Sequence, residues 1–131
     1  MSISQDDVHF TGHAIECRIN AEDPSHNFFP SPGTIRSLDW PSGEGIRVDT
    51  GVEAGSVVSP YYDSLLAKLA VHAADRDAAI AATLAALEAT HIEGVKTTVP
   101  VHLALLARPE FAEVSHHSKF IETAADLMGA K

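Results

Sequence analysis

Arg47 is the residue in this sequence whose type and position best suit a catalytic or ligand-binding role. It lies in residues 46–50, where apolar and polar side chains alternate, so we expect its side chain and that of Asp49 on the polar side of a strand. A guanidinium group presents a planar fork of N–H donors that can bind an oxyanion through two hydrogen bonds. Most surface arginines are only solvated, so the local pattern leaves both interpretations open.

A second polar group follows a strand that we expect over residues 13–20. It consists of Glu16, Arg18, Asn20, Glu22 and Asp23. These residues precede a segment that contains three prolines, which forces an irregular loop. The pattern favours a network of ion pairs and hydrogen bonds that orders this loop.

Eight histidines raise the possibility of a metal site, but their spacing does not support one. His9 and His13 are four residues apart in a segment expected to be extended, and the adjacent His116 and His117 would diverge. The sequence contains neither Cys-x-x-Cys nor His-Glu-x-x-His. No metal ligand is therefore assigned, and a β-rich metal-binding module remains the weaker alternative.

The sequence has no recognisable nucleophile or phosphate loop. Cys17 is the only cysteine and falls on the apolar side of its strand, which favours a buried, inert thiol. The Gly-x-Ser-x-Gly pattern is absent, and Gly43-Glu44-Gly45 is too short and too acidic to hold a phosphate. With 131 residues, the chain is also short for an enzyme that binds a nucleotide and a second substrate.

Composition excludes several classes of partner. A formal net charge of −9 argues against nucleic acid and against anionic membranes, because both require a basic surface. No apolar run approaches the roughly 20 residues of a membrane span. The polar, acidic start does not resemble a signal peptide, and a cytoplasmic location is expected.

The elements that must position these residues divide into strands first and helices later. Residues 13–20, 34–40 and 46–50 are predicted strands, and Phe28 and Phe29 are expected to turn inward and anchor the proline-rich loop. Residues 64–72 are ambiguous between strand and helix, and the sequence favours a strand over residues 67–72. Asp75 is a plausible N-cap for a helix.

The expected helix carries its apolar stripe at Ile80, Leu84 and Leu87, with spacing i, i+4 and i+7. Gly94 ends this unit, and a second helix is predicted over residues 100–107, before Pro109. Phe111 and residues 120–121 are expected to pack back on the core.

Several segments resemble the C-terminal domain of biotin carboxylase, in the family order and over nearly the whole chain. They are residues 12–24 (GHAIECRINAEDP), 29–33 (FPSPG), 45–50 (GIRVDT), 60–69 (PYYDSLLAKL), 76–77 (RD), 94–98 (GVKTT) and 120–122 (FIE). Four separate longer motifs in the same order make a chance match implausible. The resemblance implies an α+β fold in which an antiparallel sheet is flanked by helices.

The resemblance also implies a function. Enzymes of this family use ATP and bicarbonate to carboxylate biotin on a carrier protein, and their ATP-grasp domain, which precedes the C-terminal domain, holds the nucleotide, the Mg or Mn ion and the catalytic base. None of those motifs occurs in this sequence. The family arginine on the biotin side of the active site matches Arg47, whose implied role is to stabilise negative charge on the ureido oxygen.

The implied organisation has three parts. Residues 1–11 would be the end of the ATP-grasp domain or a segment next to a tag, residues 12–123 the C-terminal domain, and residues 124–131 a tail. The matching domain contributes to a homodimer interface in bacterial enzymes, and the positions that match this interface are near Val71, His72 and Arg76. For Arg76, a purely structural role at the helix start is an equal alternative.

The implied partners are the ATP-grasp domain, the biotin carboxyl carrier protein and a second subunit. A biotin carboxylase subunit of acetyl-CoA carboxylase, in fatty acid biosynthesis, is the preferred interpretation. The same domain from a propionyl-CoA, methylcrotonyl-CoA, pyruvate or urea carboxylase would look similar. The chain is expected to be inactive alone and to bind no cofactor by itself. A stand-alone dimerisation or scaffold module is the alternative from a different functional class.

Overall fold

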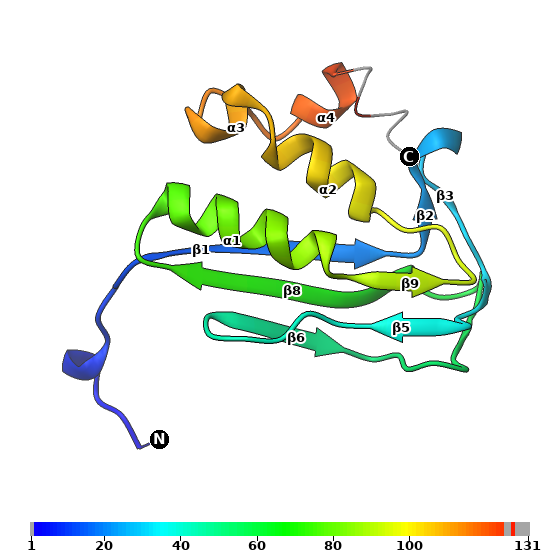
Figure 1. Cartoon of the computed structure of the whole chain (residues 1–131), viewed down its shortest axis with the longest axis horizontal. Coiled ribbons are helices and arrows are strands. Elements are labelled where there is room, and N and C mark those ends of the chain that lie inside the picture. The colour runs from blue at the N-terminus through cyan, green and yellow to red at the C-terminus, as the bar shows by residue number, and fades with distance from the viewer. Residues whose placement is uncertain (1, 125–126, 128–131) are drawn as a thin grey trace.

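The structure is a computed structural model that describes residues 2–124 and 127. Its centre is a three-stranded antiparallel sheet in the order β1–β8–β6, formed by β1 (His13–Asn20), β8 (Leu65–Ala73) and β6 (Ile46–Thr50). Helices α1 (Arg76–Glu88) and α2 (Val99–Leu106) lie on one side of this sheet (Figure 1). The predicted α+β class, with an antiparallel sheet and flanking helices, is confirmed.

Three two-stranded ribbons complete the sheet structure. They pair β2 (Glu22–Asp23) with β3 (Phe29–Pro30), β4 (Gly33–Thr34) with β7 (Val57–Val58), and β5 (Ser37–Asp39) with β9 (His91–Glu93). Two short 3-10 helices, η1 (Gln5–Asp7) and η2 (Pro24–His26), and two short helices, α3 (Pro109–Ala112) and α4 (Phe120–Thr123), make up the rest. The segment that contains η1 projects away from the body (Figure 1).

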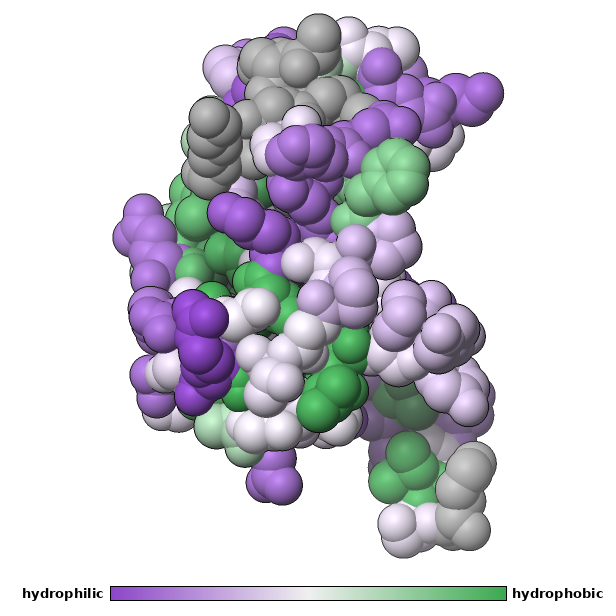
Figure 2. All heavy atoms as spheres, turned by 90° about the vertical axis from the view of Figure 1, so that its right-hand side faces the viewer, coloured by the Kyte–Doolittle hydropathy of each residue, from purple (hydrophilic) through white to green (hydrophobic). Residues whose placement is uncertain are grey.

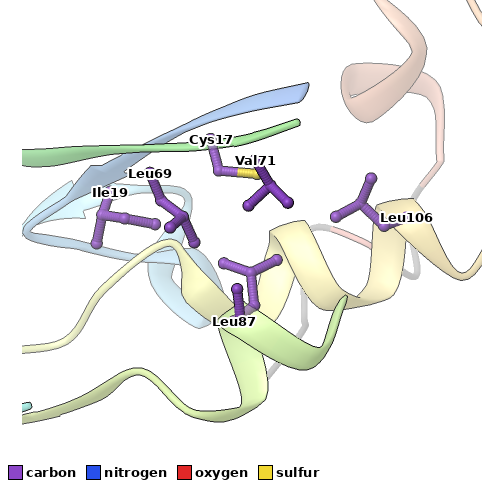
Figure 3. Close-up of a cluster of buried hydrophobic side chains, with 7 residues drawn as sticks. Cys17, Ile19, Leu69, Val71, Leu87 and Leu106 are labelled. Atoms are coloured by element: carbon purple, nitrogen blue, oxygen red, sulfur yellow. The ribbon is translucent and has the colours of Figure 1, made fainter. Parts of the chain in front are cut away.

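The core lies between the central sheet and the two longer helices. Alternation along β1 and β8 directs Cys17, Ile19, Leu69 and Val71 toward the helices, where they meet Leu87 and other apolar side chains (Figure 3). A second, smaller cluster forms around Ile35, which is fully buried. The strand prediction for residues 13–20 and 46–50 is confirmed, and the strand favoured over residues 67–72 is part of a longer strand.

Helix α1 begins as its sequence predicts. The Asp75 side chain accepts a hydrogen bond from the backbone N–H of Ala78 at 2.9 Å, which satisfies one of the free donors at the helix start. The second helix occupies residues 99–106, one position before the predicted range. Among the described residues, none of the helices combines the length and the hydropathy that crossing a bilayer would require.

Two expectations about the first half of the chain are wrong. Residues 34–40 do not form one strand, because the backbone changes partners: Ile35 N donates to Ser56 O, whereas Arg36 N donates to Glu93 O. Phe29 does not turn inward, since its side chain is 68% exposed, and Phe28 is only half-buried. The proline-rich loop is instead anchored by the buried Pro24 and by Asp23, which caps η2.

The C-terminal part packs beyond the predicted end of the domain. Phe111 contacts the main core cluster, Phe120 and Ile121 are half-buried, and Leu127 is 1% exposed. The predicted tail covers residues 124–131, of which residues 125–126 and 128–131 lie outside the described part of the chain.

Candidate functional site

One face of the central sheet is not covered by the helices, and it carries the polar residues that the sequence singled out. We call it the outer face and define it by Glu16, Arg18, Arg47, Asp49, Lys68 and Ala70. Directly opposite residues in antiparallel strands project to the same side, so the register places Arg47 beside Ala70 and Asp49 beside Lys68. Glu16 and Arg18 flank the same two β8 residues from β1, on the other side of the central strand. The outer face therefore combines charged side chains with one small apolar side chain, that of Ala70.

Arg47 lies on the edge strand β6, and its side chain is 75% exposed. Its Nε atom donates a hydrogen bond to Oδ1 of Asp49 at 3.0 Å. The two terminal nitrogens have no partner among the described residues. Because Ala70 is the neighbour on β8, no bulky side chain from that position crowds the guanidinium group.

This geometry suits reversible binding of an oxyanion. The contact with Asp49 uses Nε and leaves the terminal N–H donors available for a planar ligand. Such an exposed ion pair contributes about 0–1 kcal/mol, so Arg47 can reorient toward a ligand at small cost. The sequence predicted that Arg47 and Asp49 would share a face, but not that they pair, because side-chain rotamers decide the pairing.

The remaining polar residues near β1 separate into two groups. Glu16 and Arg18 lie on the outer face, whereas Asn20 and Glu22 lie at the end of β1, where the Asn20 amide donates to Glu22 at 3.1 Å. A hydrogen bond from the Ser25 hydroxyl is the main cause that lowers the pKa of Asp23. The predicted network is therefore present only in part: Asn20, Glu22 and Asp23 make hydrogen bonds at the start of the loop. Glu16 and Arg18 lie apart from them, and no ion pair joins the five residues in the described part of the chain.

The three residues predicted near a dimer interface have different surroundings. The side chain of Val71 is 1% exposed and packs in the core, so it cannot offer a surface to a partner. His72 is exposed, and its Nε2 lies 2.7 Å from Thr11 O. Of the three, His72 and the half-buried Arg76 keep some surface exposure, and the interface itself remains a prediction.

Arg76 connects three elements inside the molecule. Its guanidinium donates to the carbonyl oxygens of Phe111 and Ala112, at 2.6 and 3.4 Å, and NH1 lies 3.2 Å from His13 Nε2. The guanidinium carbon also lies 4.8 Å from the centre of the Phe111 ring. These contacts give Arg76 a structural role between β1, α1 and α3.

Neither the thiol nor the histidines form a reactive centre. Burial is the main cause that raises the pKa of Cys17 to about 12, so the thiol stays protonated near neutral pH. Within residues 2–124 and 127, no three His, Cys, Asp or Glu side chains are grouped as metal ligands would be. Lys68 and Ala70 are two outer-face residues that the sequence prediction does not include, although alternation along residues 65–73 places both on that side.

Known proteins resemble this chain over most of its length. Residues 16–123 match the family described as the biotin carboxylase C-terminal domain. Biotin carboxylase 1 of Bacillus subtilis is 48% identical over 130 residues, which are 99% of this chain and 29% of that protein. The 2-oxoglutarate carboxylase small subunit of Hydrogenobacter thermophilus is 44% identical over 119 residues, covering 91% of this chain and 25% of that protein.

Solved structures agree with these matches. One is the biotin carboxylase domain dimer of Hydrogenobacter thermophilus 2-oxoglutarate carboxylase, in complex with MgADP, ADP and bicarbonate. It matches this chain with a TM-score of 0.92 and 41% sequence identity, and the match covers 98% of this chain and 28% of that one. The biotin carboxylase subunit of a pyruvate carboxylase has a TM-score of 0.93 and 42% identity, covering 100% and 29%. This chain spans less than a third of these relatives, and by sequence and fold it belongs to the biotin carboxylase C-terminal domain family.

Proposed function

We propose that this chain forms the biotin side of a biotin carboxylase active site, with Arg47 as its catalytic residue. The observation that carries the proposal is the exposed guanidinium of Arg47, whose terminal nitrogens have no partner among the described residues. The resemblance places a charge-stabilising arginine at this position, and the geometry on β6 is compatible with that role.

Biotin, delivered on a carrier protein, would supply the ureido nitrogen that accepts the carboxyl group. As that nitrogen loses its proton, negative charge develops on the ureido oxygen, and the terminal N–H donors of Arg47 would stabilise it. The contact of Asp49 with Nε would leave those terminal donors available to biotin. In this role the chain stabilises negative charge on biotin and needs no contact with the nucleotide.

The rest of the reaction is assigned to other parts of a longer enzyme. ATP, the Mg or Mn ion, bicarbonate and the catalytic base would bind in an ATP-grasp domain that precedes this segment. In this division residues 1–11 are the end of that domain, residues 12–123 form the C-terminal domain, and residues 124–131 follow it. A relative of this chain binds MgADP and bicarbonate in its whole biotin carboxylase domain, of which the match covers 28%, and this is compatible with the division.

The preferred parent is a cytoplasmic acetyl-CoA carboxylase, an ATP-dependent carbon–nitrogen ligase that serves fatty acid biosynthesis. Its biotin carboxylase subunit would act with a biotin carboxyl carrier protein and form a homodimer to which His72 and Arg76 contribute. Relatives named biotin carboxylase, pyruvate carboxylase and 2-oxoglutarate carboxylase share this domain. We therefore assign the choice of the final carboxyl acceptor to another part of the enzyme.

The test uses a complete carboxylase that contains this segment. Arg47→Ala is expected to reduce carboxylation of free biotin by about 10²–10³-fold, the effect of losing one oxyanion-binding group. Arg47→Lys keeps the charge but not the planar fork and is expected to recover only part of the rate. Lys119→Ala, which also removes one exposed charge, is the matched control. Equal rates for Arg47→Ala and Lys119→Ala would refute the proposal.

A further inference from the structure

Two of the nine basic residues lie together on a part of the surface that the proposed function does not use. Arg36 and Lys96 line one cavity of about 310 Å³, with Ser31, Gly94 and Val95. Neither basic side chain has an ion pair or hydrogen bond among the described residues. In a chain of net charge −9, this cavity combines two cations that no described carboxylate pairs with.

The walls of this cavity are held in place by backbone contacts. Arg36 N donates to Glu93 O at 2.7 Å, and Lys96 N donates to the Ser31 hydroxyl oxygen at 2.9 Å. Gly94 has a φ of +106°, and a Cβ at this position would collide with the backbone oxygen of Thr34. The glycine therefore permits the close approach that brings Arg36 and Lys96 to the same cavity.

The nearby carboxylates do not neutralise this pair. Glu93 is not among the residues that line the cavity, and its carboxylate lies 3.3 Å from His91 Nε2. Asp23 lines only the adjoining pocket, and its oxygens contact Ser25 and His26. Since Ser31 Oγ accepts from Lys96 N, its own hydrogen remains free to donate to a ligand.

A second pocket of about 500 Å³ adjoins the basic cavity and shares Val95 and Lys96 with it. Its wall has an apolar part, formed by Pro24, Ile92, Val95 and Pro100, and a polar part that includes Asp23, Ser25, His26 and Thr97. Figure 2 faces this end of the molecule, where hydrophilic side chains border exposed apolar surface. The two pockets together could accept a ligand with an anionic group and a small apolar body.

We infer that Arg36, Lys96 and the Ser31 hydroxyl form a binding site for the phosphate group of a small phosphate monoester, whose apolar body lies in the adjoining pocket. Two cations match a dianionic phosphate better than a single carboxylate, and the hydroxyl adds a neutral donor. The site is separate from Arg47 on the outer face. It also gives a role to Lys96, which lies in a motif that the biotin reaction leaves unexplained.

Titration of the 131-residue chain with phenyl phosphate and with inorganic phosphate, followed by amide NMR shifts, tests this inference. We expect saturable shifts at residues 94–97 with both probes, and tighter binding of phenyl phosphate because its ring occupies the adjoining pocket. Arg36→Gln and Lys96→Gln are each expected to weaken binding about tenfold, the loss of one charge-assisted contact. Lys119→Gln is the matched control and should bind like the original chain.

Two results would overturn the inference. One is the absence of saturable shifts at residues 94–97 with either probe. The other is equal affinity of Arg36→Gln, Lys96→Gln and Lys119→Gln, which would mean that the anion responds to overall charge and not to this cavity. Because the measurement uses neither biotin nor ATP, its failure would leave the role proposed for Arg47 unaffected.

Discussion

At the scale of single residues, the central sheet separates an exposed arginine from a buried thiol. Arg47 and Cys17 lie on opposite sides of the same three-stranded sheet, one exposed and one buried. Alternation along β6 and β1 is sufficient to assign the side of each, so this part of the site is predictable from sequence. The hydrogen bond between Arg47 and Asp49 is not predictable in this way, because it depends on rotamers.

The first prediction concerns the reactivity of Cys17. Burial raises the pKa of this thiol to about 12, from an ordinary value of 9.0, so very little thiolate exists at pH 8. Labelling by a disulfide reagent at pH 8 is expected to be slower than in the urea-unfolded chain by roughly a hundredfold or more. Labelling at equal rates in the two states would show that the thiol is not buried.

At the scale of elements, the turn after β9 fixes the path of two segments that are far apart in sequence. Gly94 holds a positive φ and lies against the backbone of Thr34 and Arg36, where any side chain would collide. The glycine thus joins the β5–β9 ribbon to the loop that leads into α2. This contact also forms one wall of the proposed phosphate site.

Substitution of Gly94 is the second prediction. Gly94→Ala is expected to lower the free energy of unfolding by about 2 kcal/mol or more, because the added Cβ meets a backbone oxygen and φ is unfavourable. Gly51→Ala is the control, since a Cβ there meets nothing within 4 Å. Urea unfolding of both variants measures the difference, and equal midpoints would contradict the predicted backbone contact.

The third prediction distinguishes the structural role of Arg76 from a role in dimerisation. Arg76→Met removes the hydrogen bonds to Phe111 and Ala112 and is expected to cost about 1–3 kcal/mol of unfolding free energy. Amide hydrogen exchange in α3 should become faster at the same time. Unchanged stability and exchange, together with loss of dimer in a complete enzyme, would assign Arg76 to the interface instead.

The elements differ in how far the sequence could predict them. Long, regularly alternating segments such as β1 (His13–Asn20) and the capped start of α1 (Arg76–Glu88) follow from local pattern. Residues 34–40 do not, because their backbone pairs first with Ser56 and then with Glu93, and this choice is tertiary. The three-residue strand β9 is too short to show a period, and Phe29 is exposed despite its apolar type.

At the scale of the whole molecule, the sheet is covered on one side only. Helices α1 and α2 lie on the inner side (Figure 1) and bury its apolar side chains. The outer face exposes Arg47 among other charged residues. The chain spans 29% of the length of a Bacillus subtilis relative. A one-sided domain of this size is suited to completing a site whose other residues belong to another domain.

The fourth prediction follows from this division of the active site. The purified 131-residue chain is expected to show no bicarbonate-dependent ATP hydrolysis and no carboxylation of free biotin. A mock purification from cells that do not express the chain measures the background from contaminating ATPases. Hydrolysis that requires bicarbonate and exceeds this background would contradict the assignment of the nucleotide site to another domain.

The most direct test of the role of Arg47 compares two reactions of one variant. In a complete carboxylase with Arg47→Ala, the account predicts that carboxylation of free biotin falls by about 10²–10³-fold. Bicarbonate-dependent ATP hydrolysis measured without biotin should stay within about threefold of the original rate, because that step does not involve the ureido oxygen. An equal loss of both reactions, or no loss of carboxylation, would contradict the biotin-side role of Arg47.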